Sequence, residues 1–161
     1  MSTTKTPSDL ATTAETAAGV AQFLAPVVID LEALVVQGKQ AHWHVRGTAF
    51  DEVHRQLDQI VANAQDFADT AAERIVALGL PLDSRLATVA EKNTLPGLPD
   101  GFSGWEETVA NVTAQLDAAL VTIRTAVAEL ETIDMSSQDV AIEIERGVTK
   151  DRWLLQAHVA G

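Results

Sequence analysis

The feature that most constrains this chain is a pair of apolar stripes with helical spacing, separated by a four-residue link. The residues of the first stripe are Val20, Leu24, Val27, Leu31, Leu34, Gly38, Ala41 and Val45. Those of the second stripe are Phe50, Val53, Leu57, Ile60, Val61, Ala64, Phe67, Ala68, Ala71, Ile75 and Leu78. Steps of three, four or seven residues are typical of helices that bury one face. Because residues 46–49 allow only a tight connection, the two helices are predicted to be antiparallel neighbours.

Composition favours a helical bundle with an aliphatic core. Hydrophobic residues make up 47% of the 161-residue chain but aromatic residues only 4%, so Ala, Val, Leu and Ile must fill the interior. Closely packed helices suit such a core better than a sheet does. We therefore predict one all-α domain over residues 1–161, with residues 1–16 as a flexible tail.

A long connection is predicted between the second and third helices. Residues 80–83 end the second helix, and Ser84 is placed to cap a short helix that reaches about Glu91. Residues 93–101 contain two prolines and two glycines and are predicted to be a loop. This pattern indicates a four-helix bundle with one long crossover that carries a short extra helix.

The third and fourth helices have their own start signals and stripes. Ser103 followed by Glu106 predicts a capping box at the start of the third helix, and the fourth is predicted to begin near Ser136 or Ser137. Pro26 predicts a kink in the first helix or marks its true start. The third stripe comprises Val109, Val112, Leu116, Ala119, Ile123, Val127 and Leu130. The fourth comprises Val140, Ile144, Val148, Leu155 and Val159.

Two histidines are predicted to lie level with each other across the first pair of helices. His42 and His54 are each six residues from Thr48, which sits in the link. Neighbouring helix axes are about 8–10 Å apart, so the two imidazoles can face a common volume. A lone histidine on an apolar stripe is more often a packing residue than a ligand. The two together need further donors to indicate a metal site.

Carboxylates on the second helix supply those donors in two separate pairs. His54 and Asp58 share one face at i, i+4, and so do Asp69 and Glu73. Asp58 and Asp69 are eleven residues apart, which is about 16 Å along a helix, whereas metal–ligand bonds are about 2 Å long. Either the chain holds two unrelated half-sites, or a two-fold axis brings Asp69 and Glu73 of a second copy against His42, His54 and Asp58. An isologous dimer makes two such sites at once.

These residues resemble the signature of the mini-ferritins called Dps, the DNA-protection-during-starvation family. The resemblance covers the first two helices closely and extends to the fourth helix at residues 137–139 and 153–158. It is carried by residues 38–43, Gly47, Phe50, His54, Asp58 and residues 69–75. In that family the bundle is ferritin-like, the iron site lies between two subunits, and twelve subunits close into a hollow cage. All five family ligand positions are filled here, by His42, His54, Asp58, Asp69 and Glu73.

The resemblance implies an iron-oxidising and iron-storing protein that protects against oxidative damage. Fe(II) is expected between His42, His54 and Asp58 of one subunit and Asp69 and Glu73 of its partner, with hydrogen peroxide as the preferred oxidant. Ferric ion then mineralises inside the cage. Imidazole and carboxylate also suit zinc or manganese. The Glu-x-x-His pattern, by which other ferritins build a site inside each subunit, does not occur in this chain.

Two residues beside the predicted ligands need separate interpretation. His44 stands where the family pattern usually has Asn, and two helical steps turn it about 200° away from His42. Trp43 and Trp153 are predicted to be packing residues. For Trp43, whose position is next to the predicted iron site, interception of a stray oxidising equivalent is the alternative.

Charge and composition bear on partners and location. The chain has 23 acidic and 11 basic residues and a formal charge of −12, which attracts cations. Residues 1–9 contain one lysine, whereas family members that bind DNA directly use lysine-rich tails, so weak or absent DNA binding is predicted. The chain has no cysteine, which rules out disulfides and thiolate metal sites. No secretory signal and no apolar run of about 20 residues was recognised, so a cytoplasmic location is expected.

Two other functions fit the same residues. A carboxylate–histidine metal site can activate water, so a metal-dependent hydrolase of amides or esters, such as N-acyl amino acids, is one alternative. A non-catalytic cage that binds metal only structurally is the other. Rapid Fe(II) oxidation would exclude the second, because a closed structural site offers no open coordination position.

Overall fold

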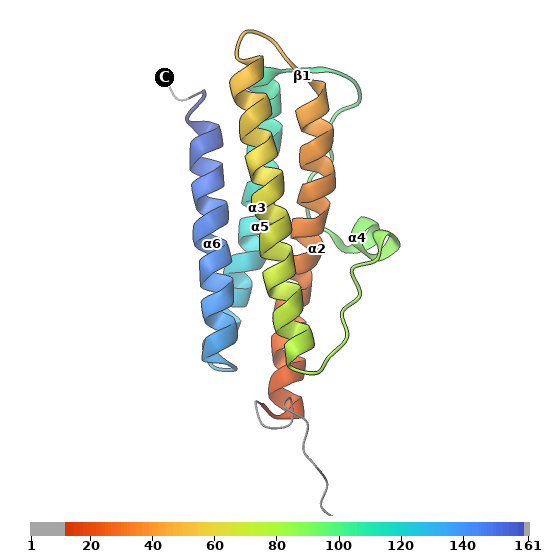
Figure 1. The fold of residues 1–161 in the computed structure, drawn as a ribbon, viewed down its shortest axis with the longest axis vertical. Coiled ribbons are helices and arrows are strands. Elements are labelled where there is room, and N and C mark those ends of the chain that lie inside the picture. Colours follow the sequence, from red (N-terminus) through yellow and green to blue (C-terminus); the bar gives the residue numbers. More distant parts are fainter. Residues whose placement is uncertain (1–11, 160–161) are drawn as a thin grey trace, which may run out of the picture.

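The computed structural model describes residues 12–159, and four long helices lie side by side in it (Figure 1). The four are α2 (Ala14–His44), α3 (Phe50–Ala77), α5 (Trp105–Leu130) and α6 (Met135–Gln156). A short helix, α4 (Leu86–Lys92), packs against α2 from within the long connection between α3 and α5. The predicted all-α bundle with a single crossover is confirmed.

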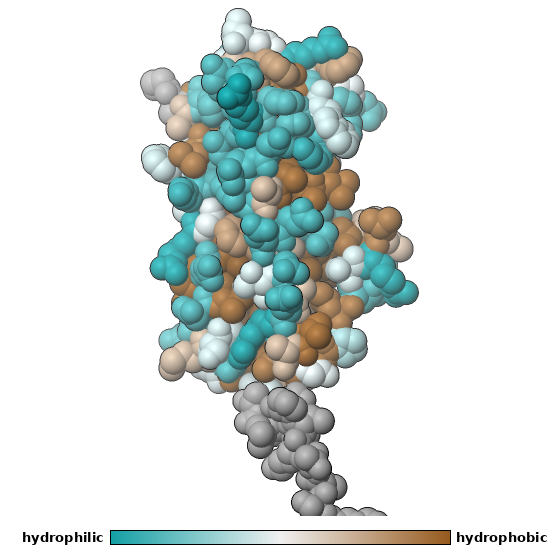
Figure 2. Space-filling view, viewed as in Figure 1, coloured by the Kyte–Doolittle hydropathy of each residue, from teal (hydrophilic) through white to brown (hydrophobic). Residues whose placement is uncertain are grey.

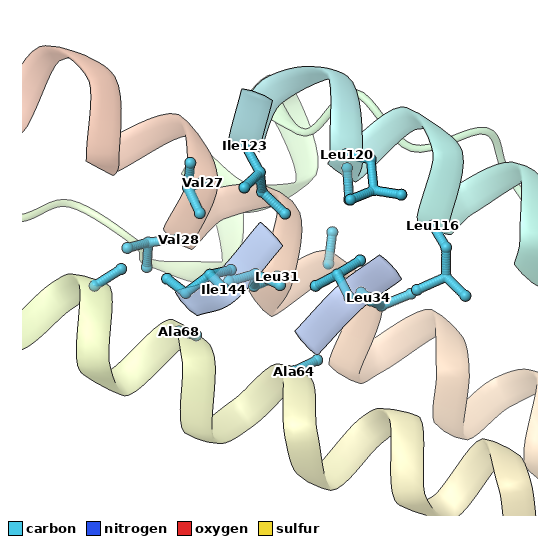
Figure 3. Close-up of a cluster of buried hydrophobic side chains, with 14 of the residues drawn as sticks. Val27, Val28, Leu31, Leu34, Ala64, Ala68, Leu116, Leu120, Ile123 and Ile144 are labelled. Carbon is cyan, nitrogen blue, oxygen red and sulfur yellow. The ribbon is translucent and has the colours of Figure 1, made fainter. Parts of the chain in front are cut away.

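The core lies along the axis of the bundle, where aliphatic side chains of all four long helices meet (Figure 3). Every residue of the first predicted stripe is buried, from Val20 to Val45. In the second stripe Phe50 is 41% exposed and Phe67 is half-buried, while the others are buried. The ring of Phe67 lies against Gly147 of α6, where an added Cβ would come within 2.1 Å of it. Helical periodicity thus located the buried faces of α2 and α3.

The start of α2 differs from the prediction. Thr13 caps the helix by accepting a hydrogen bond from the Thr16 backbone N–H at 3.1 Å, so residues 14–16 are helical rather than part of a flexible tail. The rest of that predicted tail, residues 1–11, lies outside the described residues. Pro26 is inside the helix and does not mark its start. Its side chain is exposed, on the side away from the core.

The length and composition of α2 also contradict the expectation that no apolar run approaches the membrane-spanning length. An 18-residue window in α2 has a mean hydropathy of 1.8, which meets the length and composition of a membrane-spanning helix. Half of that window is buried inside the bundle. α2 is therefore a core helix that has the length and composition of a membrane-spanning one, because its apolar side chains pack against three other helices.

The crossover is attached to the bundle by buried polar contacts. Asp30, in the middle of α2, accepts hydrogen bonds from the Thr94 backbone N–H at 2.7 Å and from the Thr94 and Thr122 hydroxyls at 2.8 and 2.6 Å. Asp30 is 1% exposed, so these three donors replace the water that its carboxylate loses. One side chain therefore joins α2, the crossover and α5.

Helix starts in the second half of the chain were predicted less well than helix stripes. Arg85, not Ser84, precedes α4, and its backbone N–H donates to the Asp83 carboxylate at 3.2 Å. The predicted capping box is wrong, because α5 begins at Trp105 after Gly104 and no side chain caps it. Asp134 caps α6 by accepting from the Ser137 backbone N–H at 2.9 Å, and the helix begins at Met135, one or two residues before the predicted start.

A two-residue parallel strand pair joins the α2–α3 turn to the end of the crossover. β1 (Val45–Arg46) pairs with β2 (Ser103–Gly104) in the register Val45 to Ser103. Ser103 lies in β2, which is why it does not cap α5. Gly47 follows β1 with a φ of +120°, and a Cβ there would lie 2.7 Å from the Trp105 ring. The turn between the two histidine-bearing helices is thus held by a segment about sixty residues away in sequence.

Candidate metal centre

The histidine pair lies where the register of the two helices predicts it. The rings of His42, near the end of α2, and His54, in the second turn of α3, are stacked with centroids 3.6 Å apart and planes at 22°. His42 Nδ1 is 2.9 Å from the His54 carbonyl oxygen, and His54 Nδ1 is 2.9 Å from the His42 carbonyl oxygen. His42 is buried and His54 is half-buried. These reciprocal bonds join the two helices directly above their shared turn.

The reciprocal bonds also decide which ring nitrogens are free to bind a metal. A carbonyl oxygen can only accept, so both Nδ1 atoms carry hydrogens and donate. In each neutral ring the lone pair then belongs to Nε2. Histidines that bind metals commonly donate their other N–H to a backbone carbonyl in this way, which fixes the tautomer and the orientation of the ring. The pair therefore presents two oriented Nε2 atoms before any metal arrives.

Asp58 lies one turn along α3 from His54 and next to His42. Its Oδ1 is 3.5 Å from His42 Nδ1 and forms an ion pair with Lys39 Nζ. The Lys39 hydrogen bond holds the pKa of Asp58 below its usual range, and the nearby His42 contributes in the same direction. The carboxylate is thus ionised at neutral pH, as a metal ligand must be. It borders an open groove of about 500 Å³ that Lys39 and Arg55 also line.

The second carboxylate pair is at the other end of the same helix. Asp69 and Glu73 are both exposed, and α3 is continuous from Phe50 to Ala77. Eleven helical steps separate Asp58 from Asp69, or about 16 Å. Asp69 borders a separate, acidic groove of about 310 Å³, to which α2 contributes Glu32 and α3 contributes Asp66. The structure thus places three of the five predicted ligands near one another at the histidine end, without converging them on one point, and keeps the other two apart from them.

The described part of a single copy does not contain a converged ligand set. Within residues 12–159, no three histidine, aspartate or glutamate side chains are close enough together to hold a metal ion. At the histidine end, His42 and Asp58 are not yet arranged to share a metal. The imidazole nitrogen closest to Asp58 is His42 Nδ1, which already donates to the His54 carbonyl. Metal binding by His42 and Asp58 therefore requires the carboxylate to turn from its present position.

Sequence reasoning missed Lys39 and misjudged two tryptophans. Lys39 is three residues before His42, a spacing that places both on one face of α2 and was the available signal. Trp43 and Trp153 are 62% and 63% exposed, so neither is a packing residue within one chain. His44 is 3.1 Å from the Gln40 side chain and 5.3 Å from the Phe102 ring centroid, so its contacts are separate from the histidine pair.

Comparison with known proteins agrees with the helical architecture. The family model for the ferritin-like domain matches residues 28–161. Together with the four-helix bundle and its single crossover, this match defines a ferritin-like protein. A Dps from Microbacterium arborescens, solved in its high iron form, is 56% identical, with a TM-score of 0.90 over 92% of this chain and 97% of that one.

Curated relatives narrow the class to one family. The DNA protection during starvation protein of Agrobacterium fabrum is 32% identical over 161 residues, covering 99% of this chain and 98% of that protein. DNA protection during starvation protein 2 of Deinococcus radiodurans is 31% identical over 136 residues, which are 84% of this chain but 56% of the longer relative. The chain belongs to the Dps family of the ferritin-like superfamily. It is accordingly an iron-binding mini-ferritin of a class that protects DNA.

Proposed function

We propose that this protein oxidises Fe(II) at a site shared by two subunits and stores the ferric product in a closed shell. The observation that carries the proposal is the stacked pair of His42 and His54, whose Nδ1–H groups are both bound to carbonyl oxygens. Two oriented Nε2 atoms beside an ionised Asp58 are half of a site that suits ferrous iron.

The partner subunit supplies the other half in this proposal. Asp69 and Glu73 are on the same face of α3 as Asp58, about 16 and 22 Å along the helix from it. A two-fold axis that crosses α3 midway between them places each acidic end against the other copy's histidine end. Charge supports this pairing, because Lys39 and Arg55 line the groove at the histidine end while Glu32 and Asp66 line the groove at the acidic end.

Exposed apolar surface next to the site supports self-association. Val36 and Trp43, on α2, are 60% and 62% exposed and border a groove of about 540 Å³ that Leu98 and Pro99 of the crossover complete. Figure 2 shows hydrophobic surface over the upper half of α2 among largely polar neighbours. A second copy that covers this face removes apolar area from water. Twelve such subunits in a hollow cage, located in the cytoplasm, complete the proposal.

Iron is the substrate of the proposed reaction. Five protein ligands shared between two metals leave coordination positions open for an oxidant. Two Fe(II) ions give one electron each to hydrogen peroxide, its O–O bond breaks, and two protons are taken up to form two water molecules. No hydroxyl radical is released when both electrons arrive together. The negatively charged chain draws further Fe(II) to the shell, where ferric ion hydrolyses to mineral.

Direct DNA binding is proposed to be weak. Acidic residues outnumber basic residues 23 to 11. Six of the basic side chains in the described part of the chain are already in ion pairs: Lys39, Arg55, Arg74, Arg85, Arg124 and Arg152. Phosphate binding needs clustered cations that remain available. A gel-shift assay at physiological salt is expected to show no retained complex. A tight complex that dissociates as salt is raised would contradict this part of the proposal.

The test is anaerobic loading with Fe(II) followed by peroxide, with ferric ion measured by its absorbance. Wild type is compared with the double variant His54→Ala, Asp58→Ala. The proposal requires fast oxidation by wild type and loss of about 100-fold or more in the variant while the shell stays assembled. Equal rates in the two proteins, no faster than buffer, would overturn it.

A further inference from the structure

We infer that Lys39 is a built-in cation that holds Asp58 while the metal site is empty and competes with the metal for that carboxylate. The inference rests on the proposed function, since it takes Asp58 to be a ligand. It starts from one contact, the ion pair of Lys39 Nζ with Asp58 Oδ1 across the α2–α3 interface. Lys39 is otherwise unexplained by the fold, because its side chain is 37% exposed and lies beside the groove at the histidine end.

The present position of Asp58 is not the one that a metal needs. Oδ1 faces Lys39 and is 3.5 Å from His42 Nδ1, a nitrogen already used to donate to the His54 carbonyl. The nitrogens available for a metal are the two Nε2 atoms. Asp58 must therefore turn from Lys39 to share a metal with the imidazoles. A metal on Asp58 would also meet the charge of Lys39 at close range, because metal bonds to carboxylate oxygen are about 2 Å long, and the two cations would repel each other.

A cation at this position also has a role before metal binds. In the proposed dimer Asp58 faces the partner's Asp69 and Glu73, so three carboxylates come together at each empty site. Lys39 supplies a positive charge against that repulsion and is close enough to act on Asp58 directly. Arg55 lines the same groove but pairs with Asp51, one turn earlier on α3, at 3.0 Å. The two cations are therefore a matched pair of which only Lys39 contacts the predicted ligand.

The experiment is calorimetric titration of the assembled, metal-free protein with Zn²⁺, which binds the same donor types without oxidation. Lys39→Met keeps the length and packing of the side chain and removes its charge. Arg55→Met removes a charge from the same groove without touching Asp58, and His54→Ala identifies the binding that belongs to the site. We expect Lys39→Met to bind zinc about tenfold more tightly than wild type and Arg55→Met to match wild type within about twofold.

The oligomeric state of the same proteins gives the second readout. Without metal, Lys39→Met is expected to dissociate at lower denaturant than wild type, and saturating Zn²⁺ is expected to remove the difference. Lys39→Arg, which keeps the charge, should behave like wild type in both assays. Zinc affinity in Lys39→Met equal to or weaker than wild type would overturn the inference. If His54→Ala leaves zinc binding unchanged, both in the wild-type background and together with Lys39→Met, the proposed metal site itself is wrong.

Discussion

The two ends of α3 carry the two halves of the same proposed site, yet they are organised in opposite ways. At the histidine end, His42, His54 and Asp58 are held by bonds within one chain, including two reciprocal bonds to backbone carbonyls. At the acidic end, Asp69 and Glu73 are both exposed, and Asp69 borders an open groove. An imidazole nitrogen has a single lone pair that must be aimed at the metal, whereas a flexible carboxylate can adjust to a metal that is already positioned. In the proposed dimer, one subunit therefore presents the metal site and the other closes it.

Mixing two variants that each lack one half of the proposed site tests this comparison most directly and has the largest expected effect. One variant lacks the histidine end, His54→Ala with Asp58→Ala, and the other lacks the acidic end, Asp69→Ala with Glu73→Ala. Each is expected to lose Fe(II) oxidation by about 100-fold or more alone. Unfolding and reassembling an equal mixture should restore about a quarter of the wild-type sites, because each mixed dimer has one intact site.

Stopped-flow absorbance of ferric ion measures the recovery, and the two variants assembled separately and then combined are the control. Recovery in the reassembled mixture alone supports a shared site. An acid-end variant that keeps wild-type activity would show that Asp69 and Glu73 are not ligands and that the two ends are unrelated.

A buried aspartate of α6 that contacts the middle of α3 makes the stability of the bundle depend on pH. Asp151 of α6 is 3% exposed and accepts hydrogen bonds from the single Asn63 side-chain amide at 2.8 and 3.0 Å. Burial raises the pKa of Asp151 to about 6, from 3.8 for an ordinary aspartate. Between pH 4 and 6 the Asp151 carboxyl therefore binds more protons in the folded state than in the unfolded state. Its contribution to the free energy of unfolding is fully present below about pH 4 and is lost as the pH rises through 6. The loss is about 3 kcal/mol.

Asp151→Asn removes this dependence and is expected to raise the free energy of unfolding at pH 7.5 relative to wild type. Urea unfolding of both proteins from pH 4.5 to 7.5 measures the difference, which should shrink toward acid pH. Asp139→Asn, an exposed substitution on the same helix, is the control and should change stability by less than about 0.5 kcal/mol. A difference between Asp151→Asn and wild type that does not vary with pH would contradict the assignment.

The histidine end depends on a turn that only glycine can make. Gly47 has a φ of +120°, and a Cβ there would meet the Trp105 ring at 2.7 Å. Gly47→Ala is expected to lower the free energy of unfolding by about 2 kcal/mol and to slow Fe(II) oxidation, because the turn sets the level of the two histidines. Gly97→Ala is the matched control, since no atom lies within 4 Å of its added Cβ. If both variants are equally stable, the turn does not constrain the site.

One arginine attaches the acidic end of α3 to the start of α6. Arg74, next to Glu73, donates to the Ser137 hydroxyl at 2.9 Å and to the Asp134 carboxylate at 2.7 Å, which joins α3 to the start of α6. Arg74→Met is expected to cost about 1 kcal/mol of stability, measured by thermal unfolding. Arg85→Met, at a fully local pair with Asp83, should cost almost nothing. A larger loss at Arg85 than at Arg74 would contradict the proposed anchor.

Several parts of the molecule were predictable because they depend on local periodicity. The stripes of α2 and α3 identify their buried faces, and the equal distances of His42 and His54 from Thr48 place the rings together. Helix starts were less predictable, because Ser103 has the sequence of a cap but pairs as a strand with Val45. Val45, more than fifty positions earlier in the chain, thus decided whether Ser103 is a helix cap or a strand residue.

The sequence by itself determined the all-α bundle, its crossover and the order of the candidate ligands along α3. These follow from which side chains avoid water at helical spacing and from the fixed rise of a helix. Only the tertiary structure decided that the imidazoles donate to each other's backbone carbonyls and that Lys39 holds Asp58. Those contacts depend on the distance and rotation between two helices, which a one-dimensional pattern does not encode.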